Sequence, residues 1–351
     1  MQEKLRALLA ALPCHSVIMG WNTDAGLNRR LLELIHSFSL PCFLWLPALA
    51  EAQGVKECRH LTNCSGVQSK RLMHFEEESF QFYCPSDPFS AGHLQEIYEQ
   101  YFACLPFDGV FLDKIRFPSF ANGYEDGFGC FCPDCTADFI KNGLDVQAIR
   151  ERIARHDRSL TEGEYRGGLY RFADPEVDRF YRIRSAQITR YVGGLVRYFK
   201  GRGLKVGLDI YAPFFAYHVG QDIGRLTQEA DFIKPMLYRF TTAPAGIRYE
   251  YDAYMRWFDG DNSFSAYWKG DPSSVESISR QKPLLDAAGC AVYPGIEVNV
   301  IEGMSGVTEE RLRENLELFS GLGYQTLACC WNCLKTGDSF TDILKQKAAK
   351  K

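Results

Sequence analysis

The hydrophobic positions of the chain alternate between short continuous runs and longer stretches in which they recur every three or four residues. A short apolar run predicts a buried strand, and the wider spacing predicts the apolar face of a helix. Eight runs fit strands, at residues 15–21, 41–46, 80–84, 108–113, 205–210, 231–238, 290–298 and 326–331. Because helical stretches separate them, the pattern is typical of a parallel sheet built from strand–helix units.

Several of the intervening helices are clearly marked by their apolar faces. One continuous face is expected from Leu94, Ile97, Tyr98, Tyr101, Phe102 and Leu105. Near the C-terminus, Thr308 is a candidate N-cap, and Glu309 and Glu310 would place negative charge at the positive end of the helix dipole.

Eight strands and their helices in 351 residues favour an α/β fold of the closed (β/α)8 type, a TIM barrel, over an open doubly wound sheet. No G-x-G-x-x-G follows the first strand, and no phosphate-binding G-x-x-x-x-G-K-[ST] occurs. The longest gap lies between the fourth and fifth strands, so we expect a long insertion after the fourth strand at residues 116–174. No linker or repeat divides the chain, and residues 1–351 are expected to form a single barrel domain.

Net charge and composition exclude some classes of binding partner. The net charge is -4 without a strongly basic block, which argues against binding to nucleic acid or to anionic lipid. No apolar run approaches the roughly 20 residues of a membrane span. Residues 1–12 interleave charged and apolar positions and do not resemble a signal peptide, so we expect a cytoplasmic protein.

In this fold the active site lies at the carboxyl ends of the strands, so acids that close an apolar strand are the catalytic candidates. Asp113 ends the fourth strand, Glu297 ends the apolar part of the seventh, and Asp209 lies near the end of the fifth. Two acids across a barrel mouth suit glycoside hydrolysis. We expect Asp113 as nucleophile or charge stabiliser and Glu297 as general acid/base, with the roles reversible and Asp209 as third candidate.

Each acid also has a purely structural interpretation, as an N-cap or as half of an ion pair. Arg116, three residues after Asp113, is a possible partner. Side chains near the predicted strand ends are candidate sugar contacts, namely Tyr238, Arg239, Lys114, Trp331, Tyr211 and Trp21. Aromatic rings suit the apolar faces of sugars, although the same rings also serve as core packing.

Three segments resemble glycoside hydrolase-like TIM-barrel families. They are residues 107–113 (FDGVFLD) with Arg116-Phe117-Pro118 behind them, residues 231–238 and residues 293–297. The resemblance implies the barrel and a carbohydrate substrate, and such families use the terminal Asp as nucleophile, acid or hydroxyl ligand. The segment is also similar to the chitinase strand, but Ile115 stands where chitinases carry the catalytic Glu. Nor does an Asn-Glu pair end the strand as in the large retaining β-glycosidase clan, so the role of Asp113 stays open.

The chain has thirteen cysteines, an odd number in a protein too large to need disulfide bridges. Cys130, Cys132 and Cys135 form a C-x-C-x-x-C motif that can wrap a tetrahedral ion. Cys84 ends the predicted third strand and is the favoured fourth ligand, with Cys104, Cys58 and Cys64 as lesser options. The cluster is similar to the zinc site of family 42 β-galactosidases, and four thiolates leave no open position, so we expect structural zinc.

The leading hypothesis is an enzyme, a glycoside hydrolase acting on a carbohydrate or glycoconjugate. One alternative is a non-catalytic saccharide-binding barrel. Another is a lyase or isomerase that uses a divalent metal held by Asp113, Asp209 and Glu297. The sequence leaves open the sugar and its anomer, retention or inversion, exo or endo action and the oligomeric state.

Overall fold

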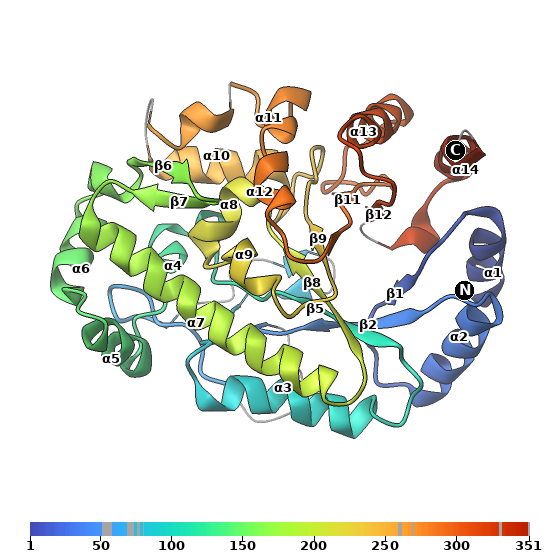
Figure 1. The fold of residues 1–351 in the computed structure, drawn as a ribbon, viewed down its shortest axis with the longest axis horizontal. Helices are drawn as coiled ribbons and strands as arrows, with labels where there is room; N and C mark the ends of the chain where they lie inside the picture. Colours follow the sequence, from blue (N-terminus) through green and yellow to red (C-terminus); the bar gives the residue numbers. More distant parts are fainter. Residues whose placement is uncertain are drawn as a thin grey trace.

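The computed structural model describes residues 1–50, 58–68, 74–75, 78–79, 81–258, 262–268, 270–329 and 332–349. A six-stranded parallel sheet runs in the order β1 (Val17–Met19), β2 (Cys42–Pro47), β5 (Gly109–Asp113), β8 (Lys205–Ile210), β9 (Phe232–Pro235) and β10 (Ala291–Val292). A parallel pair, β11 (Gly295–Ile296) and β12 (Ala328–Cys329), continues it through a bridge between Met236 and Gly295. The sheet curls with helices around it, in the α/β architecture of a TIM barrel (Figure 1).

The helices with the strongest sequence signals form as expected and pack outside the sheet. They are α2 (Ala25–Ser37), α3 (Pro88–Tyr101), α7 (Pro175–Lys200) and α13 (Glu309–Gly321). The predicted cap of α13 is confirmed, because the side chain of Thr308 accepts a hydrogen bond from the backbone N–H of Arg311. Figure 1 shows the long helix α7 lying across the sheet near α3, and α1 (Gln2–Ala11) beside α2.

The remaining described elements are short or peripheral. They are β3 (His74–Phe75), β4 (Glu78–Ser79), α8 (Pro213–Ala216), η3 (Tyr217–Val219), α9 (Ile223–Leu226), α10 (Ile247–Trp257), η4 (Ser265–Trp268), α11 (Val275–Ser279), α12 (Lys282–Asp286), η5 (Cys333–Lys335) and α14 (Asp338–Ala349). None of the described helices is both long enough and apolar enough to cross a membrane.

The third predicted strand is wrong as a member of the parallel sheet. Strand β2 pairs directly with β5. In the described part of residues 80–84, Phe82 and Tyr83 instead form isolated antiparallel bridges with Ala50 and His60. The segment is apolar because Phe82 and Cys84 are buried beneath the barrel loops. A short apolar run indicates that a segment is buried, but burial alone does not distinguish a sheet strand from a packed loop.

The predicted strand at residues 290–298 is split into two. Strand β10 pairs with β9, whereas β11 pairs with β12, and Pro294 lies between them. Proline has no N–H to donate to a ladder, so the strand is interrupted there, although the bridge between Met236 and Gly295 keeps the segment beside the end of β9.

The interior of the curled sheet is filled by a small aromatic cluster of Phe43, Phe111 and Phe232, with Trp45 and Tyr293 packed against it. Two glycines on the same interior face, Gly109 and Gly207, make room for these rings. A Cβ on Gly109 would come within 2.6 Å of the Phe43 ring, and one on Gly207 would meet the ring of Phe232. Alternate residues such as Val110, Leu112 and Leu208 face the helices instead.

The long connection between β5 and β8 carries its own short elements. They are η1 (Phe120–Asn122), α4 (Tyr124–Gly127), α5 (Pro133–Lys141), α6 (Val146–Ala154), η2 (Arg158–Leu160) and the antiparallel hairpin β6 (Gly163–Arg166) and β7 (Leu169–Phe172). The hydroxyl of Tyr165 donates to the Phe214 carbonyl at 2.6 Å, which ties the hairpin to α8 above the barrel. In Figure 1 this connection forms the left side of the molecule.

Candidate functional site

A cavity of about 1320 Å³ runs through the interior of the curled sheet and continues between the helices α1, α2, α13 and α14. Its lining extends from Lys205 and Asp231, at the amino ends of strands, to polar side chains at the carboxyl ends. Those at the carboxyl ends include Trp45, Asp113, Lys114, Arg116, Asp209, Lys234 and Tyr238. The polar groups therefore meet where TIM-barrel active sites are built.

Asp113 is the last residue of β5, and it is oriented by hydrogen bonds to its carboxylate. The indole Nε1 of Trp45, from the neighbouring strand β2, donates to Oδ2 at 3.1 Å. The backbone N–H of Lys114 donates to Oδ1. Lys114 has a φ of 53°, a left-handed conformation that is uncommon for a residue with a Cβ. The chain thus turns sharply directly behind the carboxylate, as is frequent at functional sites.

Asp209 lies on β8 and is paired with a lysine that the sequence analysis did not single out. The Nζ atom of Lys234, on β9, lies 2.8 Å from Oδ2 of Asp209. Both side chains are largely buried, and the ammonium also lies 5.3 Å from the ring of Phe111 and 5.5 Å from that of Tyr238. A lysine in the otherwise apolar run of β9 was the available signal for this pair.

The strand register places the two aspartates at the same height in the sheet. Leu112 of β5 pairs with Leu208 of β8, so Asp113 and Asp209 are the next residues on neighbouring parallel strands. Asp209 in turn pairs with Lys234. Residues at one level of adjacent strands point to the same face, and such strands lie about 4.8 Å apart. Both carboxylates therefore belong to one layer of the cavity wall.

Glu297, the expected partner of Asp113, is buried in the barrel wall and is not among the residues that line the cavity. Its Oε1 accepts hydrogen bonds from the N–H of Phe240 at 2.7 Å and from the hydroxyl of Thr241 at 3.1 Å. The side chain is fully buried, and burial raises the pKa of this carboxyl.

The predicted sugar contacts divide between the cavity and the surrounding structure. Lys114 and Tyr238 line the cavity. Arg239 is turned toward α13, where its Nη1 and Nη2 bond to Asn315 at 2.8 Å and to Glu314 at 2.6 Å. Trp21 packs near Phe102 with a ring-centroid distance of 6.2 Å.

Tyr211 lies behind the cavity wall, since its hydroxyl donates to Glu250 at 2.9 Å and its side chain is buried. Trp331 lies outside the described residues.

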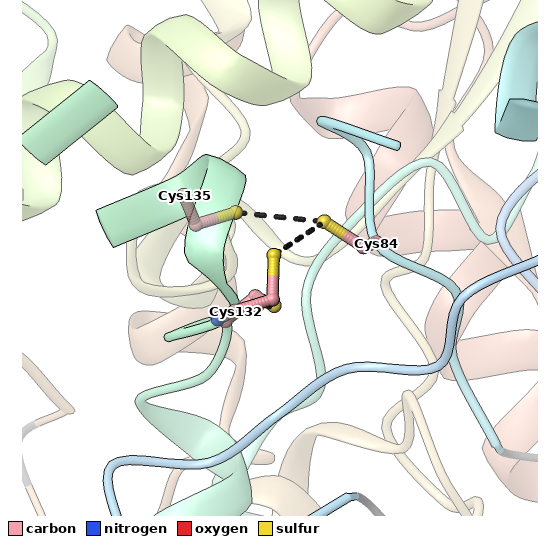
Figure 2. Close-up of side chains that lie close together, drawn as sticks. Cys84, Cys132 and Cys135 are labelled. Atoms are coloured by element: carbon pink, nitrogen blue, oxygen red, sulfur yellow. Dashed lines mark hydrogen bonds between the residues drawn. The ribbon is translucent and has the colours of Figure 1, made fainter. Parts of the chain in front are cut away.

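A second site is formed by four buried cysteines, Cys84, Cys130, Cys132 and Cys135, whose sulfur atoms all lie within 4.8 Å of one another. The Sγ of Cys84 lies 3.6 Å from that of Cys132 and 3.5 Å from that of Cys135. Figure 2 shows Cys132 and Cys135 at the start of α5, pointing toward Cys84 from a separate segment. The four cysteines expected from the sequence are the four that the fold brings together.

The geometry of this cluster fits a tetrahedral ion. Four sulfurs at about 2.3 Å from a central zinc would be separated by about 3.8 Å, close to the separations seen here. Contacts with the neighbouring thiols lower the pKa of Cys132 and raise the pKa of Cys84.

Groups around the cluster donate hydrogen bonds to its sulfur atoms. The N–H groups of Thr62 and Cys132 each lie 3.4 Å from the Sγ of Cys130. Nη1 of Arg59 lies 3.8 Å from the Sγ of Cys132. Such outer donors stabilise thiolates and orient metal ligands.

Comparison with models of known families and with curated sequences finds no match for this chain. Solved structures do match. The PgaB (BpsB) glycoside hydrolase domain of Bordetella bronchiseptica superposes with a TM-score of 0.57 at 16% identity, covering 99% of this chain and 91% of that one. A group IV chitinase of Ostrinia furnacalis gives 0.48 at 10% identity, over 99% and 94%.

An alpha-L-fucosidase of Paenibacillus thiaminolyticus gives a TM-score of 0.49 at 13% identity, over 100% of this chain and 46% of that one. The chain thus resembles glycoside hydrolase TIM barrels distantly. At this identity the similarity to the PgaB domain establishes the fold, and the chemistry must be argued from the site.

Proposed function

We propose that this protein is a glycoside hydrolase whose reacting carboxylates are Asp113 and Asp209. The observation that carries the proposal is their position in one layer of the barrel cavity, on neighbouring strands at the carboxyl end of the sheet. Aromatic side chains beneath them, among them Trp45 and Phe111, offer apolar surface to a sugar ring. The fold shared with glycoside hydrolase domains supports the same assignment.

The surroundings of the two carboxylates favour different roles. The ammonium of Lys234 stabilises the charged form of Asp209, which suits a nucleophile or a stabiliser of positive charge at the anomeric carbon. Asp113 has no cation within ion-pair distance among the described residues, so it is the carboxyl that would exchange the proton with the leaving oxygen. This assignment replaces the expected partnership of Asp113 with Glu297.

The register also favours a stereochemical outcome. The backbones of adjacent strands are about 4.8 Å apart, which is nearer to the carboxyl spacing of about 5 to 5.5 Å in retaining enzymes than to the roughly 6.5 to 9.5 Å of inverting enzymes. We therefore expect the product sugar to be released with its anomeric configuration unchanged.

Incubation of the full chain with nitrophenyl glycosides of both anomers tests the proposal. At least one glycoside should release nitrophenol, and Asp113→Asn should slow the release by a factor of about 100 or more. Saccharide binding without release by the wild-type chain across the panel would instead identify a non-catalytic binding barrel.

We further propose that the cysteine cluster holds a structural zinc ion, through Cys84, Cys130, Cys132 and Cys135. Its role would be to fasten the start of α5 to the segment before α3, because the four ligands come from these two parts of the chain. Metal analysis should find one zinc per chain in the wild type and in the exposed control Cys104→Ser, and little in Cys84→Ser. Equal zinc in all three proteins would contradict the assignment.

A further inference from the structure

Arg116 is a buried cation beside the proposed reaction centre. It follows Asp113 by three residues, lines the same cavity and is only 3% exposed. Neither its role nor its partner is explained by the hydrolysis chemistry proposed above.

Aromatic side chains hold the guanidinium in place. Its central carbon lies 4.2 Å from the ring centre of Tyr211 and 4.7 Å from that of Phe82. The Tyr211 ring is itself fixed, because its hydroxyl donates to Oε1 of Glu250 at 2.9 Å. Nη1 of Arg116 donates to the carbonyl of Phe117 at 3.0 Å. The side chain is therefore positioned before any ligand arrives, which lowers the entropic cost of binding.

Within the described part of the chain, no carboxylate lies within ion-pair distance of Arg116. Asp209 is paired with Lys234, and the carboxylate of Glu250 accepts hydrogen bonds from Tyr211 and from the N–H of Ala245. The carboxylate of Asp113 accepts from Trp45 and from the N–H of Lys114. The ion pair between Arg116 and Asp113 that the sequence allowed does not form.

Two other buried arginines of this protein have more hydrogen-bond or ion-pair partners than Arg116. Arg184 donates to the carbonyls of Gly127, Gly129 and His218 at 2.8 to 3.0 Å, and burial lowers its pKa to about 10. Arg239 has the carboxylate of Glu314. Some guanidinium N–H groups of Arg116 have no described partner, and they are not among the fully buried atoms. Because Arg116 lines the cavity, these groups face its solvent. A buried cation with this access favours an anionic ligand.

We propose that Arg116 binds the carboxylate of an acidic saccharide, so that the substrate carries a uronic-acid-type group near the bond to be cleaved. The inference rests on the proposed hydrolase function. A planar guanidinium can donate two parallel hydrogen bonds to one carboxylate, which gives both affinity and orientation. Arg116 is thus a specificity-determining residue, and a neutral sugar would leave its charge uncompensated.

Binding of methyl glucuronide and methyl galacturonide, compared with the matching neutral glycosides, tests this proposal by calorimetry on the full chain. The uronides should bind roughly tenfold tighter at low salt, and the preference should weaken as ionic strength rises. Arg116→Met should remove the preference. The matched control is Arg150→Met, because Arg150 also stacks on a ring, that of Phe131 at 5.1 Å, but does not line the cavity.

Equal binding of uronides and neutral glycosides to the wild type, or a preference that survives in Arg116→Met, would overturn the proposal. If Arg116→Met does not fold, Arg116→Lys is tested in its place. Lysine keeps the positive charge but lacks the planar pair of donors, so the preference for uronides should fall severalfold. A preference for a 6-sulfated methyl glucoside without one for uronides would also contradict the carboxylate assignment. Hydrolysis is scored separately: uronide binding without cleavage would refute the hydrolase function and leave the Arg116 site standing.

Discussion

At the scale of single residues, Asp113 and Glu297 look alike in the sequence and differ in the structure. Each is an acid at the end of an apolar strand, and the fold rules place both at the carboxyl end of the sheet. Their surroundings separate them, because Glu297 is fully buried and its Oε1 accepts hydrogen bonds from Phe240 and Thr241. Asp113 lines the cavity, whereas Glu297 is not among its lining residues. The contacts of Glu297 come from the segment after β9, and the strand pattern of the sequence does not reveal them.

Glu297 should make stability depend on pH. Burial raises the pKa of its carboxyl, so between its ordinary and its raised pKa the folded chain holds a proton that the unfolded chain has lost. The free energy of unfolding should therefore fall as pH rises through that window. Glu297→Gln should remove this dependence and be more stable at neutral pH by about 1 kcal/mol, as measured by urea unfolding at several pH values. A less stable Gln variant would show that the ionised carboxylate is needed.

Lys234→Met should destabilise the folded protein and lower its catalytic activity. Removing one partner of a largely buried ion pair takes the cation away from Asp209, at a cost of about 3 kcal/mol. The loss of the cation 2.8 Å from Oδ2 of Asp209 should also lower kcat/KM for a cleaved glycoside. Lys282→Met is the control, because its pair with Asp286 is more exposed and worth less than about 1 kcal/mol. An unchanged kcat/KM in Lys234→Met would argue against a reacting role for Asp209.

At the scale of elements, the sequence predicts helices and central strands well and the sheet connections less well. Strands β2, β5 and β8 coincide with the expected runs because they are flanked by strong helices. The run at residues 80–84 misleads because a buried loop and a buried strand share the same composition. The interruption at Pro294 can be predicted from the sequence, but the pairing of β11 with β12 depends on tertiary contacts.

Gly109→Ala tests the packing inside the sheet. A methyl group there would collide with the Lys205 carbonyl and come within 2.6 Å of the Phe43 ring, so we expect destabilisation by about 2 kcal/mol or more. The control Gly92→Ala lies in α3 with nothing within 4 Å of the added carbon, and it should be neutral or stabilising by up to about 1 kcal/mol. Urea unfolding of both variants gives the comparison, and similar stabilities would show that the interior is not tightly packed at Gly109.

At the scale of the whole molecule, the cysteine cluster joins residues that are distant in the chain. Its members could be predicted from the sequence, which shows the spacing of the three clustered thiols and the position of Cys84 at the end of an apolar run. Cys84 was chosen as the end of a parallel strand, yet it reaches the cluster from a loop. The Asp209–Lys234 pair was harder to predict, because it depends on the register between two strands.

If the cysteine cluster holds zinc as proposed, removal of the ion should destabilise the fold rather than change the chemistry. Prolonged chelation should lower the Tm by several degrees, because the thiolate site tethers two segments, and added zinc should restore it. Activity measured well below the lowered Tm should survive, since the cluster has no open ligand position for a substrate. Loss of activity in a chelated chain that is still folded would contradict a purely structural role.

The central claim is that the reacting pair is Asp113 and Asp209, on the neighbouring strands β5 and β8. Its most direct test is kcat/KM for one cleaved glycoside with Asp113→Asn, Asp209→Asn and Glu297→Gln. The two aspartate variants should lose a factor of about 100 or more, and Glu297→Gln should stay within a few-fold of the wild type. A large loss in Glu297→Gln with near-normal activity in Asp209→Asn would contradict the claim.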